Sequence, residues 1–506
     1  MNYWQNALLC AALCPLLLLT GCTRPADDPV DAPAADSITA DVQEAMTFQL
    51  PCIRGEYNPY RTNNTLTVQN AMLLFEPLTR IGPDMELDYR LAEQVVSADG
   101  VVTITLRSGC TFADGSAVTA QDAAASLLAA SHSAAYGKRF AHLLDAQPVD
   151  ERTVVVTLDS PDSLFAYLLD IPVLRMDEVA VAQPTAGGRY TYGTNGVTLV
   201  RNPRAPFPQA GPEVIDLTEV TSHANLVSGL AMGSIDLYCT EEAATAGGIT
   251  SGEIYYKTNH LLFVGINGYS SNPLCATAAG RNLLSAVVDR TELAARCYDS
   301  RANVATGILN RFYACARDAQ QISSTADTAA LETTMTQLGY ARDAETGLYT
   351  NERGLPASIR LLVYSGNSYK RFTATVLQQM WAECGIAVEI VEAEGFEDYL
   401  TAVQRGEFEL YIGEVKLYNN MDMSVFFTGE ARTGLAHGES LPAAYAAFKA
   451  DAANAAALEQ AFAAEMPLIP LLWKNGAVTA SRRITGLQPS VSDIFYSMEQ
   501  LAPASL

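Results

Sequence analysis

The sequence predicts an α/β fold, and three observations support this prediction. At 506 residues the chain is too long for one ordinary hydrophobic core, and its length suggests about three domains or subdomains. Hydrophobic residues make up 49% of the chain and charged residues 17%, which is a globular composition. Short strand patterns alternate with helical patterns along the chain, which is typical of a mostly parallel sheet with right-handed crossovers.

The first strand pattern lies at residues 102–106, where apolar and polar residues alternate. Gly109 then marks a turn, and Thr119 and Asp122 have the spacing of a capping box at the start of a helix. A second strand pattern follows at residues 154–158. These patterns predict a strand, a helix and a strand in the first third of the chain.

The clearest βαβ pattern lies nearer the C-terminus. Residues 361–364 form an apolar run typical of a buried strand, and apolar residues then recur at helical spacing over residues 372–381. Residues 386–390 alternate as a strand, and a further apolar helical stripe at residues 396–403 leads to a strand at residues 408–412. This order predicts neighbouring parallel strands.

The N-terminal segment is predicted to be a lipoprotein signal peptide. Residues 8–19 form an apolar run that is too short for a membrane span of about 20 residues but suits the core of a signal peptide. The run ends in Leu19-Thr20-Gly21-Cys22, which resembles a bacterial lipobox. We therefore expect residues 1–21 to be removed and Cys22 to carry lipid. The alternatives are an ordinary cleaved signal or a buried helix.

Residues 22–44 are predicted to be the lipidated cysteine and a flexible tether. From Thr23 to about Asp41 the chain consists mainly of Pro, Ala, Asp and Ser and has almost no bulky apolar residue. Two acyl chains anchor a protein stably where a single chain does not. The predicted location is therefore extracytoplasmic, on the cell surface or in the periplasm.

The acidic balance of the chain excludes one class of partner. Its 56 acidic and 32 basic residues give a formal net charge of −24. Such a surface repels phosphate backbones, so we expect no nucleic-acid partner. It also repels anionic lipid, so membrane attachment is expected to depend on the anchor rather than on a basic face.

The cysteine count argues against a redox or zinc site. Seven cysteines remain after lipidation and signal removal: Cys52, Cys110, Cys239, Cys275, Cys297, Cys315 and Cys384. An odd number cannot all pair, and no two have C-x-x-C spacing. Cys297 and Cys315 could form a bridge, but we expect most of these thiols to be buried as small hydrophobic groups.

The sequence carries no motif that predicts an enzyme. It has no G-x-S-x-G elbow, H-E-x-x-H pair or Walker loop, and no G-x-G-x-x-G between a strand and a helix. The five histidines are scattered and have no metal-ligand spacing. We therefore expect no catalytic residues, no metal site and no cofactor.

A series of motifs resembles one known family. The motifs lie at residues 73–80 with 91–93, 104–115, 119–122, 225–236, 263–267, 287–293 and 466–471. Their order and spacing are similar to those of the family 5 extracellular solute-binding proteins, the peptide- and nickel-binding components of ABC importers. The most specific match is the stretch from Ile104 to Asp122, and the resemblance covers nearly all of the chain after Asp41.

The resemblance implies a two-lobe fold of the periplasmic-binding-protein type (type II), with the ligand between the lobes. Two chain crossings would join the lobes, near Phe263–Asn267 and Pro467–Leu471. The implied limits are residues 45–262 plus 469–506 for lobe I, which includes an extra subdomain at about 61–184, and residues 263–468 for lobe II. Closure would be a hinge motion that ligand binding favours.

The sequence departs from the family pattern in the region expected to face the ligand. Residues 413–422 replace the usual family motif, and Leu417 stands where peptide binders of the family carry an acidic residue that takes the peptide amine. The amine would then be held by Asp422 or Glu414, or the ligand is not a peptide. Gly187-Gly188-Arg189-Tyr190 also differs from the family's pattern.

We predict a set of ligand contacts from turns, charged groups and aromatic side chains, the groups that a cleft for a polar solute requires. The candidates are Tyr57, Asn58, Tyr60, Asn267, Tyr269, Asn367, Glu414, Lys416, Tyr418, Asn419, Asp422 and Trp473. Lys416 would meet a carboxylate, Asp422 an ammonium group, and the turn before Asn367 an anion. The alternative is that these are solvated loop residues, a plain turn and, for Trp473, core.

The predicted function is delivery of a small solute, expected to be a peptide, to an ABC permease by a monomeric, lipid-anchored binding protein. Two alternatives remain open from the sequence. One is a surface lipoprotein that senses a peptide without transport, and the other is a surface hydrolase.

Overall fold

The structure is a computed structural model that describes residues 47–207, 210–239, 251–299, 301–427 and 438–504. The predicted signal peptide (1–21), Cys22 and the tether (22–44) lie outside the described residues.

The first part of the chain builds two four-stranded sheets. One has the order β1-β10-β9-β8, and its strands are β1 (Phe48–Cys52), β8 (Tyr190–Tyr192), β9 (Thr198–Arg201) and β10 (Val214–Glu219). The other is antiparallel in the order β4-β5-β7-β6, and its strands are β4 (Ala92–Ala98), β5 (Val101–Leu106), β6 (Leu143–Pro148) and β7 (Thr153–Leu158). The strands predicted at 102–106 and 154–158 are β5 and β7.

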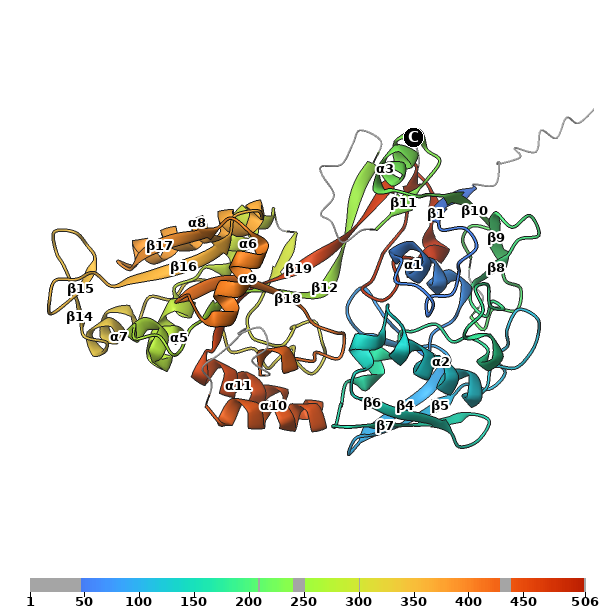
Figure 1. The fold of residues 1–506 in the computed structure, drawn as a ribbon, viewed down its shortest axis with the longest axis horizontal. Coiled ribbons are helices and arrows are strands. Elements are labelled where there is room, and N and C mark those ends of the chain that lie inside the picture. The colour runs from blue at the N-terminus through green and yellow to red at the C-terminus, as the bar shows by residue number, and fades with distance from the viewer. Residues whose placement is uncertain (1–46, 208–209, 240–250, 300, 428–437, 505–506) are drawn as a thin grey trace, which may run out of the picture. The chain divides into compact units, whose positions relative to one another are not determined.

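Three α-helices and two pairs of short strands lie in the same region, and one of these pairs comes from the C-terminal end of the described chain. They are α1 (Thr65–Leu74), α2 (Ala120–His132), α3 (His223–Met232), β2 (Thr79–Ile81), β3 (Leu87–Tyr89), β20 (Ile484–Thr485) and β21 (Ala502–Pro503). Helix α2 packs on the sheet of β4 to β7 (Figure 1). At its start the Asp122 carboxylate accepts a hydrogen bond from the Thr119 amide at 2.8 Å, as the predicted capping box requires.

The largest sheet of the described residues has seven strands in the order β11-β19-β12-β18-β16-β17, with β13 paired to β19. Its strands are β11 (Leu237–Tyr238), β12 (Ser251–Ile266), β13 (Ala302–Val304), β16 (Ser358–Tyr364), β17 (Ala387–Ala393), β18 (Leu410–Lys416) and β19 (Leu468–Ser481). Only β16 pairs in parallel, with β17 and β18, while the other pairings are antiparallel. The prediction of a mostly parallel sheet is therefore wrong for this sheet as a whole and holds only for the βαβ segment.

The helices of this second part flank the sheet. They are α4 (Pro273–Ala276), α5 (Ala278–Ala286), α6 (Arg290–Tyr298), α7 (Leu331–Gln337), α8 (Ser368–Glu383), α9 (Phe396–Arg405), α10 (Ser440–Ala450) and α11 (Ala455–Glu465), and a hairpin joins β14 (Tyr340–Arg342) to β15 (Tyr349–Asn351). Helices α8 and α9 confirm the predicted helices. Phe372 of α8 is 45% exposed, however, so it does not belong to the buried stripe that the sequence predicted.

The buried apolar residues form separate cores. The first core runs from Phe48 to Cys239 and includes Val478 to Leu501, so both ends of the described chain share it. The second core lies between residues 262 and 472. A third cluster joins first-part residues such as Ile81 and Leu164 to Leu261 and Trp473.

Two long strands run from the first core to the second. Figure 1 shows β12 and β19 side by side, and their pairing shifts register between Tyr256 and His260. The predicted crossing at 263–267 contains Val264 and Ile266, which are buried in the second core. Strands β12 and β19 pass between the first and second cores near residues 257–260 and 474–477. The predicted crossings and the lobe limits stay a prediction.

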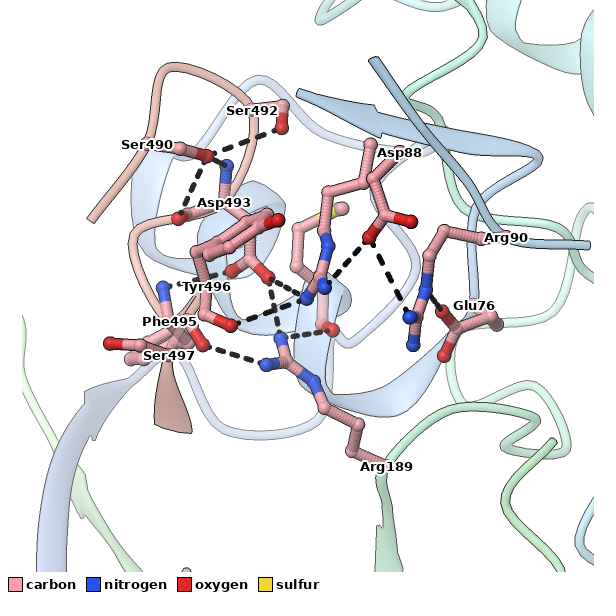
Figure 2. A network of polar contacts seen from close by, with 12 residues as sticks. Glu76, Asp88, Arg90, Arg189, Ser490, Ser492, Asp493, Phe495, Tyr496 and Ser497 are labelled. Atoms are coloured by element: carbon pink, nitrogen blue, oxygen red, sulfur yellow. Dashed lines mark hydrogen bonds and ion pairs between the residues drawn. The ribbon is translucent and has the colours of Figure 1, made fainter. Parts of the chain in front are cut away.

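The C-terminal segment is fixed to the first core by a buried ionic network, shown in Figure 2. The Asp493 carboxylate lies 2.7 Å from Arg189 and 3.5 Å from Arg80. Arg90 pairs with Glu76 at 2.6 Å close by. These charges are paired inside the protein, which removes most of the cost of burying them.

Cys297 and Cys315 are both free thiols, so they do not form the disulfide considered from the sequence. Within the described residues, no helix is both long and apolar enough to cross a bilayer.

Candidate ligand-binding site

The parallel strands of the seven-stranded sheet, β16, β17 and β18, end at one edge. Strands β16, β17 and β18 end at Tyr364, Ala393 and Lys416, and β18 pairs there with His260 at the crossing. In α/β sheets, ligands bind beyond the carboxyl ends of parallel strands. This edge, next to the crossing strands, is therefore the candidate site.

A charged group, which we call the Glu414 cluster, lies at this edge and consists of Glu414, Lys370, Lys474 and His260. One carboxylate oxygen of Glu414 accepts a hydrogen bond from Lys474 Nζ at 2.7 Å, and the other lies 3.1 Å from Lys370 Nζ. His260 Nδ1 is 3.9 Å from the carboxylate. Burial opposes the charge of Glu414, but the two lysines hold its pKa below the usual value. Glu414 is therefore ionised and clamped between two cations.

Sheet pairing places Lys416 beside this cluster. His260 pairs directly with Lys416 on β18 and with Lys474 on β19. Directly paired residues point to the same face of a sheet, and Glu414 shares that face because it lies two residues before Lys416. His260, Lys416 and Lys474 therefore stand in one row across the sheet.

Helix α8 adds a helix start to the same edge. The Asn367 side chain accepts a hydrogen bond from the Lys370 amide at 3.0 Å and so caps the helix. Tyr369 stacks on Tyr298 with ring centroids 5.7 Å apart. The predicted turn before Asn367 is thus placed beside the Glu414 cluster, although the Asn367 oxygen is already used as the cap.

The loop after β18 contacts the first part of the chain. Asn419 Nδ2 lies 3.2 Å from Asp170, and Asn420 Nδ2 lies 2.5 Å from Asp162. The Tyr418 side chain packs against the first core. The loop that the sequence singled out therefore contacts residues that lie about 250 positions away in the chain.

Asp422, in the same loop, has local partners. Its carboxylate accepts hydrogen bonds from Tyr445 at 2.7 Å and from the Ser424 amide at 2.9 Å, and it lies 3.8 Å from His142 of the first lobe. Burial opposes the charge, but these hydrogen bonds lower the pKa of Asp422.

Three predicted contacts from the first lobe are buried in the structure. Asn58 is fully buried, and its amide nitrogen donates to the carbonyls of Val179 and Val181 at 2.9 and 2.8 Å. Tyr57 and Tyr60 are also buried, and the Tyr60 hydroxyl donates to the Pro172 carbonyl. These side chains shape the first lobe, and a ligand contact for them stays a prediction.

The remaining predicted residues lie elsewhere. Asn267 follows the far end of β12, where its amide donates to Gly406 and Phe408 carbonyls, and Tyr269 is 77% exposed beyond it. Both stand at the opposite end of the sheet from the crossing. Trp473 is 1% exposed within the third cluster, which favours the core alternative.

The sequence reasoning missed Lys370, Lys474 and His260. The chain has only six lysines, but that Lys370, Lys416 and Lys474 meet at this edge is visible only in the structure. The partners Asp162 and Asp170 had no local signal, because they lie about 250 residues from the loop that they contact. Among the described side chains, no group of three or more His, Cys, Asp or Glu could share a metal ion.

Known proteins are similar to this chain in sequence over short stretches. The glutathione-binding protein GsiB of Escherichia coli (strain K12) is 32% identical over 149 residues, which are 28% of this chain and 29% of GsiB. GsiB of Salmonella typhi is 36% identical over 124 residues, 24% of each chain. The matches therefore span less than a third of these relatives.

Solved structures are similar over nearly the whole chain. The unliganded open form of the periplasmic murein tripeptide binding protein MppA has a TM-score of 0.72 at 16% identity, covering 91% of this chain and 98% of that one. A nickel ABC transporter structure from Bacillus halodurans has a TM-score of 0.71 at 17% identity, covering 90% and 99%. At these identities the likeness concerns the fold, and the predicted two-lobe fold is confirmed.

The family match is the broadest sequence finding. Residues 86–430, well over half of the chain, match the family described as bacterial extracellular solute-binding proteins, family 5 Middle. This is a family of substrate-binding proteins rather than enzymes. The chain belongs to the bacterial extracellular solute-binding proteins of family 5.

Proposed function

We propose that this chain is a lipid-anchored, monomeric receptor outside the cytoplasm that closes around a small peptide and delivers it to an ABC permease. The observation that carries the proposal is the loop after β18. It leaves the edge beside the Glu414 cluster, and its Asn419 and Asn420 bind Asp170 and Asp162 of the other lobe. A ligand held at this edge would therefore lie beside the contacts of Asn419 with Asp170 and of Asn420 with Asp162, which join the lobes in this proposal.

The choice of a peptide is supported by the relatives and by the chemistry of the edge. GsiB binds glutathione and MppA a murein tripeptide, according to their names. The Glu414 cluster and the stacked Tyr298 and Tyr369 offer charged and flat apolar partners. Within this proposal, the contacts of the second lobe are Glu414, Lys416, Tyr418, Asn419 and Asp422.

The proposal includes the lobe limits and the anchor predicted from the sequence. Lobe I would take in residues 45–262 and 469–506, and lobe II residues 263–468. The shared first core, which holds both ends of the described chain, supports a discontinuous lobe I. The anchor rests on the lipobox-like sequence at Cys22.

A thermal-shift panel tests solute binding. The purified protein is heated with oligopeptides, opines, sugars and metal chelates. A true ligand at one hundred times its Kd stabilises the folded state by about 2.7 kcal/mol and raises the Tm. We expect peptides to raise the Tm, and a panel in which no solute changes it would contradict the proposal.

A separate experiment tests the anchor. In the native host, Cys22→Ser is expected to release the protein from the membrane fraction, because the acyl chains that hold it there can no longer be attached. Retention of the Cys22→Ser variant in the membrane would contradict the anchor and leave solute binding untouched.

A further inference from the structure

We propose that the Glu414 cluster is an anion subsite, so that the preferred solute carries an additional carboxylate, as a peptide with an acidic side chain does. This inference rests on the proposed function and adds the charge class of the solute.

The first argument is the charge balance within the cluster. The two oxygens of Glu414 are each taken by a different lysine, Lys474 at 2.7 Å and Lys370 at 3.1 Å. The single negative charge of Glu414 is therefore paired with the positive charges of both lysines, and these three side chains together carry a net charge of +1. Each ammonium group has three N–H donors, of which Glu414 takes one. A second carboxylate can therefore be accepted without breaking the existing pairs.

The second argument is access. The side chains of Lys370 and Lys474 are 18% and 30% exposed, so their ammonium groups are partly sheltered and still reachable. Charged hydrogen bonds are stronger in such partly desolvated places than in open water. Glu414 also holds both lysines in fixed positions, which reduces the entropy lost when a solute binds.

The third argument concerns the surrounding field. With a formal net charge of −24, the protein as a whole repels anions, so an anionic solute needs a local positive site. Two of the six lysines, Lys370 and Lys474, stand at this edge within reach of one carboxylate. Lys370 also lies in the first turn of the 16-residue helix α8, whose dipole adds positive potential there.

The acids at the lobe contact do not offer an equivalent place for a cation. Asp162 is paired with Lys449 at 3.0 Å, and Asp170 is paired with Arg139. Because these carboxylates are already neutralised, a cationic solute would have to compete with a buried ion pair. The charges at the edge therefore favour an anion.

Calorimetry with three matched tripeptides tests the charge class. Ala-Glu-Ala, Ala-Gln-Ala and Ala-Lys-Ala differ in one side chain, and glutarate and inorganic phosphate show whether a free carboxylate or any oxyanion suffices. We expect Ala-Glu-Ala to bind with a Kd about tenfold lower than Ala-Gln-Ala, and Ala-Lys-Ala to bind more weakly than both. The preference should shrink at high ionic strength.

Two variants assign the preference to the cluster. Lys474→Met keeps the length of the side chain but removes its charge, and should reduce the preference for Ala-Glu-Ala to about twofold or less. Glu414→Gln frees both lysines and should strengthen Ala-Glu-Ala binding, an effect that simple structural damage would not produce. Lys138→Met, which changes an exposed lysine of the first lobe, is the control and should bind like the wild type.

The outcomes separate the two proposals. If Ala-Gln-Ala binds as well as Ala-Glu-Ala, or Ala-Lys-Ala binds best, the anion subsite is wrong while peptide capture stands. If phosphate competes as well as glutarate, the site is a general oxyanion site and the carboxylate class is wrong. If no peptide binds and the thermal-shift panel is also negative, both proposals fail.

Discussion

At the scale of single residues, the buried carboxylates differ in the partners that hold them. Two lysines hold Glu414, and two arginines hold Asp493. Glu459 of α11 has only neutral partners, which are two backbone amides and one glutamine side chain. A cation stabilises the charged form of a carboxylate much more than neutral amides do when water is excluded. The three residues are therefore expected to respond differently to substitution.

Glu459 makes a prediction about pH. It is fully buried and accepts hydrogen bonds from the Leu309 and Ile308 amides at 2.8 and 3.1 Å, and burial raises its pKa to about 7. The folded state therefore keeps a proton that the unfolded state has lost between about pH 4.5 and 7. The contribution of Glu459 to the free energy of unfolding is full below this window and falls by about 3 kcal/mol as pH rises through it.

Urea unfolding at a series of pH values checks this prediction. The free energy of unfolding of the wild type should fall between about pH 5 and 7, and that of Glu459→Gln should not show this fall. This difference is expected even if the two proteins differ in stability at any single pH. Parallel pH profiles for the two proteins would show that Glu459 does not titrate in this window.

Asp493 makes a prediction about stability. Asp493→Asn leaves the buried Arg80 and Arg189 without their shared counter-charge, so we expect it to lower the free energy of unfolding by about 3 kcal/mol. The control is Glu213→Gln, because the Glu213 side chain is 79% exposed and lies 4.0 Å from Arg201. That change should cost less than about 0.5 kcal/mol. Equal unfolding midpoints in urea for the two variants would contradict the network's role.

At the scale of elements, local periodicity was sufficient for β16, α8, β17, α9 and β18. Each has a regular apolar pattern and a turn residue at its end, and such signals lie within a few neighbouring residues. The antiparallel pairing of β12 with β18 and β19 was not predicted, because it joins strands about 150 and 200 residues apart. No local pattern specifies such a partner.

The end of α8 makes a prediction about a turn. Gly385 has a φ of +77°, and a Cβ there would lie 2.7 Å from the Gly347 carbonyl oxygen. Gly385→Ala should therefore lower the free energy of unfolding by about 1 kcal/mol, because alanine is strained in the left-handed conformation, and the clash should lower it further. Gly354→Ala is the matched control, because its φ is +75° with nothing within 4 Å of the added Cβ. Thermal unfolding should rank Gly385→Ala as the less stable variant, and the reverse order would contradict this account.

At the scale of the whole molecule, the candidate site depends on contacts between distant segments. The sequence identified the loop of Tyr418, Asn419 and Asp422, because its residue types departed from the expected motif. It did not identify Lys370 and Lys474, which come from α8 and β19 and meet only through Glu414.

The central claim is that two lobes joined by β12 and β19 close around a solute at the edge of the Glu414 cluster. Small-angle X-ray scattering of the purified protein, with and without saturating Ala-Glu-Ala, tests this most directly. We predict a smaller radius of gyration with the peptide, because binding favours the closed arrangement. Superimposable scattering curves in the presence of a peptide that calorimetry shows to be bound would contradict the claim.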